Sequence, residues 1–336
     1  MRREFCTLFD AHYLVKAVAL HGSLLRHCPD FHLTAFCFDD EAFELLERLD
    51  LPCLSLVSLD RLEALDPGLA ATKADRTRGE YCWTATPALP RAMFALRPDL
   101  HEVTYIDADL WFFSDPEPLF DELGDDSVLV TEHRYPREYA HHEINGRFNV
   151  QFLVFRRDAH GLEVLEWWHE RCLEWCYARL EDGRFGDQKY LEDWPRRFEG
   201  VHVLRHRGGG VAPWNVVRHE LRQTPDGVTV DGDPLVFFHF HKVRMLERGY
   251  DWRAPGYIVP ARARLLIYEP YLAALDAARE RILAVEPGFR GGIEASATPA
   301  ERVRHARALA LARLARHVPG VSRVRATVER LLGAAG

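Results

Sequence analysis

The stretch YIDADLWFF, residues 105–113, ends an apolar run with two aspartates that are one residue apart. Residues 103–106 are β-branched or aromatic, which predicts a strand buried on both faces. If the backbone stays extended, Asp107 and Asp109 point the same way, because side chains on a strand alternate. Two neighbouring carboxylates favour a cation between them, and Mg²⁺ or Mn²⁺ held by oxygen ligands keeps positions open for substrate phosphates. The pattern also occurs in loops and helix caps, but at the end of a hydrophobic strand it predicts a divalent metal site.

The first sixty residues alternate between strand-like and helix-like segments. Strands are expected over residues 4–9, 31–38 and 53–57, and helices over residues 14–27 and 41–49. This order predicts an α/β fold with a Rossmann-like, mostly parallel central sheet flanked by helices. Asp10 and His12 follow the first strand, so we expect them at a nucleotide-binding edge. No Gly-x-Gly-x-x-Gly follows that strand, which counts against a dinucleotide-binding fold.

Several later segments carry candidate ligand-binding side chains. Arg78 lies in a basic and aromatic segment where a cation could meet a diphosphate, with a solvated turn as the alternative. The polar loop over residues 133–146 is a candidate acceptor-side loop, because long polar loops in compact domains are commonly functional. Trp214 follows three glycines and could stack on a sugar or a base.

Two histidines flank Phe240 in the apolar strand expected over residues 234–240. His239 and His241 share a face if the strand continues, so either imidazole could ligate a metal. A histidine on an apolar strand is most often a satisfied core residue. Two of them, in a chain that already has an aspartate pair, favour a metal ligand.

At this point the sequence resembles bacterial glycosyltransferases of the GT-A fold, distantly similar to the family 8 group of glycogenins and lipopolysaccharide galactosyltransferases. Four landmarks occur in the same order, namely IDADL at 106–110, FNV at 148–150, GDQ at 186–188 and HFH at 239–241. The resemblance implies that Asp107, Asp109 and His239 bind Mn²⁺ or Mg²⁺. It also implies a nucleotide-diphosphate sugar as donor, with a UDP-sugar favoured.

The resemblance also assigns catalytic residues, and at several positions the sequence differs from the family pattern. It assigns Asn149, Asp187 and Gln188 to the catalytic face, with Asp187 and Gln188 lining the donor sugar. Considered alone, Asp187 reads as a helix cap. Trp83 stands where the family has an arginine, and Gln151 where it has a glycine. The ending HFHKVR also differs, so Lys242 and Arg244 compete as diphosphate-binding substitutes.

The implied chemistry is transfer of a sugar from the donor to a glycan or lipid-linked acceptor, in surface polysaccharide or lipopolysaccharide synthesis. The bound metal would neutralise the diphosphate leaving group, and Asp187 or Gln188 would stabilise an oxocarbenium-like transition state. The resemblance implies retention of configuration. In an inverting enzyme Asp187 would be the base, and the sequence does not separate the two. The alternatives are a metal-dependent phosphodiesterase or other hydrolase, and a non-catalytic sugar-nucleotide-binding protein.

Charge and composition indicate a cytoplasmic enzyme. The seven cysteines are odd in number and scattered, no stretch of about 18 apolar residues occurs, and the start is no signal peptide. The formal net charge of −8 argues against nucleic acid as a partner. We expect a catalytic domain over residues 1–256, a helical segment over 257–286, a linker over 287–300 and a basic helical tail over 301–336. The tail could contact anionic membrane at its inner face, or pack on the acidic body.

Overall fold

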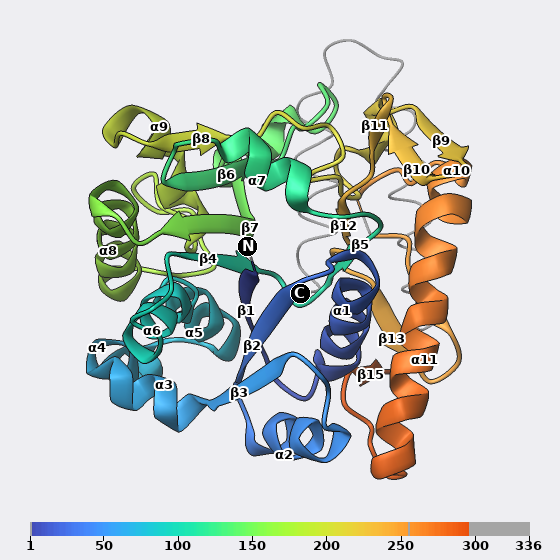
Figure 1. Ribbon diagram of the computed structural model, residues 1–336, viewed down its shortest axis with the longest axis horizontal. Helices are drawn as coiled ribbons and strands as arrows, with labels where there is room; N and C mark the ends of the chain where they lie inside the picture. The colour runs from blue at the N-terminus through green and yellow to red at the C-terminus, as the bar shows by residue number, and fades with distance from the viewer. Residues whose placement is uncertain (1, 255, 296–336) are drawn as a thin grey trace.

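A seven-stranded sheet forms the centre of the molecule (Figure 1). The computed structural model describes residues 2–254 and 256–295. The strand order is β3-β2-β1-β4-β7-β6-β8, and only β7 runs antiparallel to its neighbours. The strands are β1 (Arg3–Phe9), β2 (Phe31–Cys37), β3 (Leu54–Ser58), β4 (Glu102–Ile106), β6 (Val128–Glu132), β7 (Phe148–Arg156) and β8 (Val201–Val203). The expected α/β fold with a mostly parallel sheet is confirmed.

Helices cover both faces of this sheet (Figure 1). One layer consists of α1 (Leu14–His27), α2 (Asp40–Leu49) and α11 (Glu269–Val285), whose apolar side chains share one core. The other layer consists of α3 (Leu59–Leu65), α4 (Pro67–Thr72), α5 (Arg78–Ala85), α6 (Ala88–Leu96) and α8 (Ala159–Glu174). The layers bury the strands on both sides, which is why the strands read as continuous apolar runs.

The βαβαβ start agrees with its predicted bounds to within a residue at each end. Local signals explain this agreement. Asp39 accepts a hydrogen bond from the backbone N–H of Ala42 and caps α2. Thr77 and Glu80 form a reciprocal capping box at the start of α5. These caps place the loops after β1 and β2, and the start of α5, at one edge of the sheet.

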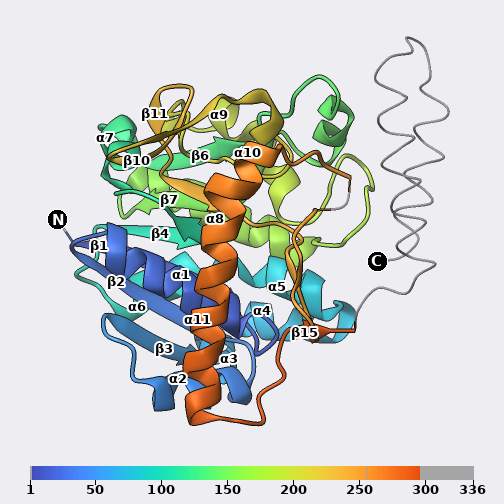
Figure 2. The ribbon, with the colours of Figure 1, turned by 90° about the vertical axis from the view of Figure 1, so that its right-hand side faces the viewer.

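The C-terminal helix belongs to the same core as the sheet. Helix α10 (Ala261–Ala263) continues through a π-helical segment, Arg264–Tyr268, into α11. Figure 2 shows α11 running beside α1, and Tyr268, Tyr271 and Ile282 are fully buried. The segment expected over residues 257–286 is therefore helical only from Ala261 and is not independent of the catalytic domain.

The linker expected over residues 287–300 is wrong for its described part. Phe289 is buried, and β15 (Ile293–Glu294) pairs in parallel with β13 (Arg244–Leu246). We call residues 289–294 the strap. The strap packs closely on the loop after β1, because a Cβ on Gly291 would lie 2.3 Å from the carbonyl oxygen of Ala11. Residues from 296 onward, including the predicted basic tail, lie outside the described residues. Within the described residues, no helix has the length and apolar character needed to cross a bilayer.

The remaining described elements are short and lie around the edges of the sheet. They are β5 (Leu110–Phe112), α7 (Glu117–Leu123), α9 (Trp194–Arg197), β9 (Leu221–Thr224), β10 (Gly227–Val230), β11 (Asp233–Pro234), β12 (Phe237–His239) and β14 (Tyr250–Asp251). Strand β5 pairs with β12, and this pair places His239 opposite Leu110, next to the end of β4.

Candidate functional site

Three side chains from two distant parts of the chain meet at the end of β4. Oxygen atoms of Asp107 and Asp109 and a ring nitrogen of His239 all lie within 4.8 Å of one another. The Nε2 atom of His239 is 3.1 Å from Oδ1 of Asp109 and 3.7 Å from Oδ2 of Asp107. Carboxylates with an imidazole suit Mn²⁺ or Mg²⁺, with Mn²⁺ the better match to the nitrogen ligand. The donor set therefore fits the expected metal.

The two aspartates converge by a different backbone route from the one expected. The strand ends at Ile106, and a turn follows in which the N–H of Leu110 donates to the carbonyl oxygen of Asp107. Strand alternation is therefore not the reason that the carboxylates converge. They converge because the turn folds back and the backbone N–H of Phe240 donates to the carbonyl oxygen of Asp109.

Gln151 orients His239 within this cluster. The Nδ1 atom of His239 lies 2.8 Å from Oε1 of Gln151, an oxygen that only accepts hydrogen bonds. Nδ1 therefore carries a proton, and Nε2 is the ring atom that faces the aspartates and would ligate a metal once it is deprotonated. Strand β12 ends at His239, yet the rings of His239 and His241 lie 5.7 Å apart and both pack against Trp214, as expected for a shared face. Of the two histidines, only His239 completes the cluster.

The electrostatics of the cluster show a compact, buried set of opposite charges. Burial alone would raise the pKa of Asp109, but the charges of His239 and Lys16 outweigh it and hold that pKa below its usual value. Burial raises the pKa of Asp107. Burial tends to lower the pKa of His239, yet Asp109 and Asp107 raise it overall. The aspartates thus attract cationic groups, which is the property a metal site needs.

Lys16 is the charged neighbour that the sequence analysis missed. It lies in the first turn of α1 and is only 7% exposed. Its Nζ atom is 3.9 Å from Oδ2 of Asp109 and 4.0 Å from the centre of the Tyr13 ring. A single lysine in the apolar segment LVKAVAL gives little signal, because long side chains commonly reach solvent from such positions.

The residues expected at the catalytic face are near the cluster to different degrees. Asp187 is buried, and burial together with the charge of Asp107 raises its pKa to about 7. Its backbone oxygen accepts a hydrogen bond from the indole N–H of Trp168, and its side chain caps no helix. Gln188 donates to the carbonyl oxygen of Asn145 in the predicted acceptor-side loop. Asp187 is thus a buried carboxyl beside the candidate metal ligands and not a simple cap.

The side-chain amide of Asn149 is held by hydrogen bonds to other protein groups. Its Oδ1 atom accepts from the backbone N–H of Gln151, and its Nδ2 atom donates to Nε2 of His133. His133 in turn donates from Nδ1 to the carbonyl oxygen of Arg147. Both ends of the Asn149 amide are therefore occupied by protein groups, and they hold the start of β7 against the predicted acceptor-side loop.

Three residues expected to contact the donor gather at the end of β1. Arg78 pairs with Asp10 at 2.7 Å and with Asp39 at 3.1 Å. His12 is exposed, and its Nε2 atom lies 4.0 Å from Glu294 of the strap. The structure brings Asp10, His12 and Arg78 to one edge of the sheet, with the guanidinium of Arg78 already shared by two carboxylates.

The aromatic and lysine candidates are placed differently from each other. Trp214 is 2% exposed and meets His239 edge-on at 5.2 Å, so in this structure its indole lies beside the cluster and largely covered. The loop before it passes close to the sheet, with Gly210 against the side chain of Thr131, and this draws the indole inward. Trp83 is half-buried and packs against Gly186. Lys242 is exposed at the turn after β12.

Comparison with known proteins places the chain among two relatives from Bacillus subtilis (strain 168). No protein-family model matches. The uncharacterized protein YfnD is 33% identical over 293 residues, which cover 86% of this chain and 94% of YfnD. The uncharacterized protein YfnF is 35% identical over 256 residues, which cover 74% of this chain and 84% of YfnF. The chain belongs to the YfnD and YfnF family.

Solved structures that align with this YfnD and YfnF family member include glycosyltransferases. The galactosyltransferase LgtC, in complex with donor and acceptor sugar analogs, is 14% identical with a TM-score of 0.44; the alignment covers 79% of this chain and 100% of LgtC. The glycosyltransferase GlyE of Streptococcus pneumoniae TIGR4 is 14% identical with a TM-score of 0.48, covering 87% of this chain and 65% of GlyE.

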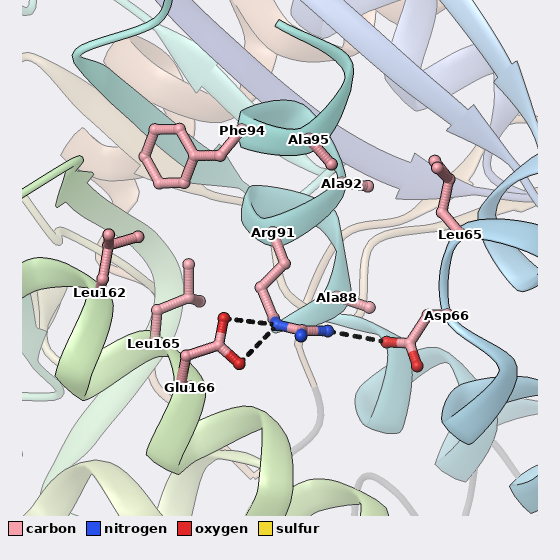
Figure 3. A pocket seen from close by; sticks show the side chains of 10 residues that line it. All are labelled: Leu65, Asp66, Ala88, Arg91, Ala92, Phe94, Ala95, Leu162, Leu165 and Glu166. Atoms are coloured by element: carbon pink, nitrogen blue, oxygen red, sulfur yellow. Dashed lines mark hydrogen bonds and ion pairs between the residues drawn. The ribbon is translucent and has the colours of Figure 1, made fainter. Parts of the chain in front are cut away.

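A pocket of this YfnD and YfnF family member lies between α6 and α8, and Asp107, Asp109 and His239 are not among its lining residues (Figure 3). Its charged lining residues are Arg91, Glu166 and Asp66, and Arg91 contacts Glu166 at 2.8 Å and Asp66 at 3.2 Å. The other lining residues are mostly apolar. The charged groups lining this pocket already pair with one another, so it lacks the convergent, ligand-seeking groups of the Asp107 cluster.

Proposed function

We propose that the chain is a metal-dependent glycosyltransferase that uses a nucleotide-diphosphate sugar, with a UDP-sugar favoured. The observation that carries this proposal is the Asp107, Asp109 and His239 cluster at the end of a central strand. Open α/β sheets bind ligands at such strand ends. The four ordered sequence landmarks meet there or next to it, since GDQ supplies Asp187 and FNV supplies Asn149.

The chain's own residues have separable roles in this proposal. Asp107, Asp109 and His239 would hold Mn²⁺ or Mg²⁺, which when bound supplies a Lewis acid for the departing diphosphate. Gln151 fixes the tautomer of His239. Tyr105 donates to Oδ1 of Asp107 at 2.8 Å, which restricts that carboxylate to one orientation. A site held in this way needs little rearrangement when the donor binds.

Asp187 and Gln188 are the residues proposed to act at the donor sugar. Asp187 lies near Asp107 in a buried setting, where a carboxyl oxygen would interact strongly with positive charge that develops at the anomeric carbon. We propose a retaining reaction, in which the departing phosphate accepts the acceptor's proton and no strong base is needed. Inversion would instead require Asp187 as the base.

The alternatives differ in what the site must contain. A two-metal phosphodiesterase or hydrolase needs additional carboxylate or imidazole ligands beside the first set. Among residues 2–254 and 256–295, the clustered ligands are Asp107, Asp109 and His239. This favours a one-metal site, which a transferase and a non-catalytic sugar-nucleotide-binding protein both fit. Turnover of a donor separates those two.

The acceptor is proposed to be a glycan or a lipid-linked glycan in surface polysaccharide or lipopolysaccharide synthesis. The support is the family resemblance and the basic composition of residues 301–336, where eight arginines accompany two glutamates. Such a segment would bring a peripheral enzyme to an anionic membrane surface.

The test is a panel of nucleotide sugars incubated with the purified protein, with release of nucleoside diphosphate as the readout. We expect release from one donor with Mn²⁺, and loss of release with EDTA or in Asp109→Ala. Asp60→Ala removes an exposed aspartate far from the cluster and serves as the matched control. Metal-dependent binding of a nucleotide sugar without any release would support the binding-protein alternative. Absence of both binding and release would overturn the proposal.

A further inference from the structure

Lys16 is a largely buried cation whose nearest carboxylate lies beyond hydrogen-bond distance. Its side chain is 8% exposed, and its Nζ atom lies near Asp109 and over the ring of Tyr13. The nearest carboxylate oxygen, Oδ2 of Asp109, is 3.9 Å away, which is too long for a hydrogen bond. A buried ammonium usually forms hydrogen bonds, because leaving its three donors unmade is costly. An anion placed beside Asp109 would offer acceptors to these donors.

The backbone around Lys16 favours the same kind of ligand. Lys16 lies in the first turn of α1, a helix of 14 residues. No side chain caps this helix and no acidic residue lies in its first turn. The N-terminus of a helix carries partial positive charge and unpaired N–H groups, which attract anions. Both features are directed to the edge of the sheet where β1 and β4 end.

Two of the other cations near this edge already have partners, whereas Lys242 is exposed at the turn after β12. Arg78 is shared between Asp10 and Asp39, and Arg244 pairs with Asp251 at 2.9 Å and with Glu294 at 3.1 Å. When Asp109 ligates a divalent metal, its charge is offset by the metal and no longer by Lys16. The ammonium is then a positive group beside the metal whose remaining close neighbour is the ring of Tyr13.

We infer that Lys16 binds the diphosphate of the donor, together with the N-terminus of α1 and the metal held by Asp107, Asp109 and His239. This inference rests on the proposed function and extends it to a residue that no sequence landmark marks. It explains how the chain binds a diphosphate although Trp83 stands where related enzymes are expected to have an arginine. The probe that isolates this contact is inorganic pyrophosphate, because it carries the diphosphate without base or sugar.

The experiment measures pyrophosphate binding by titration calorimetry in the presence of Mn²⁺, with full-length wild type and the Lys16→Met variant. We expect affinity to fall by about tenfold to a hundredfold, as for loss of a hydrogen bond to a charged group. Lys73→Met removes an exposed lysine that pairs with Glu63, and this control should bind as wild type. Affinity for Mn²⁺ alone should be retained or increased in Lys16→Met, because a positive charge beside the metal is gone.

Folding is checked in the same variants. Replacing a buried charge by an apolar side chain of similar length is commonly neutral or stabilising, so Lys16→Met should unfold at the same temperature as wild type or higher. Lys16→Gln provides a second, polar variant with the same expected loss of pyrophosphate.

Three results would overturn the inference: unchanged pyrophosphate affinity in both Lys16 variants, loss of affinity in Lys242→Met but not in Lys16→Met, or no pyrophosphate binding by wild type with Mn²⁺. The proposed function fails separately. If pyrophosphate binds through Lys16 but no nucleotide sugar is turned over, the anion site stands and the transferase proposal does not.

Discussion

Gln151 holds the imidazole of His239 by one hydrogen bond, and that bond decides which ring nitrogen faces the aspartates. Gln151→Leu removes the acceptor while keeping a side chain of similar size in a fully buried position. We expect affinity for Mn²⁺ to fall by about 10-fold to 100-fold, the usual effect of losing such an orienting partner. Metal titration followed by electron paramagnetic resonance measures this.

Two controls accompany Gln151→Leu. Gln151→Glu keeps an acceptor facing Nδ1 and should retain metal binding better than the leucine variant. Gln223→Leu changes an exposed glutamine on β9 and should leave affinity unchanged. Equal metal affinity in wild type and Gln151→Leu would show that the tautomer of His239 does not depend on this contact.

His133 should make stability depend on pH. Burial lowers the pKa of its imidazole from 6.5 to about 3, so the folded protein keeps it neutral while the unfolded chain takes up a proton below pH 6.5. Its contribution is therefore fully present above pH 6.5 and is lost as pH falls towards 3. At pH 5 the loss is about 2 kcal/mol.

Urea unfolding of wild type and His133→Gln at pH 7.5 and pH 5 isolates this contribution, because the other titrating groups are common to both proteins. The free energy of unfolding should fall by about 2 kcal/mol more in wild type than in the variant between these two pH values. An identical fall in both would mean that the ring is already protonated in the folded state.

The sequence could predict the residues whose chemistry is marked by a short pattern. Asp107 and Asp109 form such a pattern, and His239 ends an apolar strand. The roles of Lys16 and Gln151 could not be predicted in the same way, because each role depends on a contact with a residue that is distant in the sequence. Lys16 lies beside Asp109, and Gln151 binds His239. Lys16 depends on the turn that brings Asp109 to α1, and Gln151 on the pairing of β5 with β12. Such contacts are set by tertiary structure.

Among the elements, the strap over residues 289–294 packs so closely on the loop after β1 that two of its positions have no room for a Cβ atom. Gly292 has a φ of +73°, and a Cβ there would lie 2.3 Å from the carbonyl oxygen of His12. Gly249 has a φ of +80°, and a Cβ there would have no atom within 4 Å. An alanine at Gly249 would therefore have the same unfavourable φ as an alanine at Gly292, but no steric clash. Gly292→Ala should therefore be the more destabilising change, by about 1–3 kcal/mol beyond Gly249→Ala.

Thermal and urea unfolding of the two alanine variants measure the difference. Because the clash is with the loop that carries His12, Gly292→Ala should also weaken nucleotide binding, whereas Gly249→Ala should not. Equal stability of the two variants would show that the strap moves away from the loop at little cost.

Element prediction succeeded where local signals agree with the tertiary structure. Helix α1 begins at Leu14 and ends at His27 as predicted, because an apolar helical stretch lies between two strand-like segments. It failed where glycines suggested flexibility. Gly291 and Gly292 read as linker residues, yet they serve close backbone contact and let Phe289 enter the core. The same residue type permits both, and only the packing partner distinguishes them.

Over the whole molecule, the C-terminal helix and the candidate metal site share one core. The ring of Tyr271 on α11 stacks on Phe240 with centroids 3.6 Å apart, and Phe240 directly follows His239. The ring of Tyr268 packs edge-on against the same phenylalanine at 5.3 Å. Residues expected to form a separate segment thus support the strand that carries a candidate metal ligand, and the described chain should unfold as one unit.

Tyr271→Ala tests this coupling. The side chain is fully buried, so its removal should lower the free energy of unfolding by about 3–5 kcal/mol through lost burial and the cavity left behind. Leu265→Ala, at a 60% exposed position just before α11, should change stability by less than about 0.5 kcal/mol. Mn²⁺ affinity should fall in Tyr271→Ala alone, because Phe240 no longer fixes the end of β12.

Urea unfolding followed by tryptophan fluorescence and by circular dichroism should give coincident transitions in wild type and in both variants. Two separate transitions, with Mn²⁺ binding surviving the first, would show that the C-terminal helix is an independent unit and that the metal site does not depend on it.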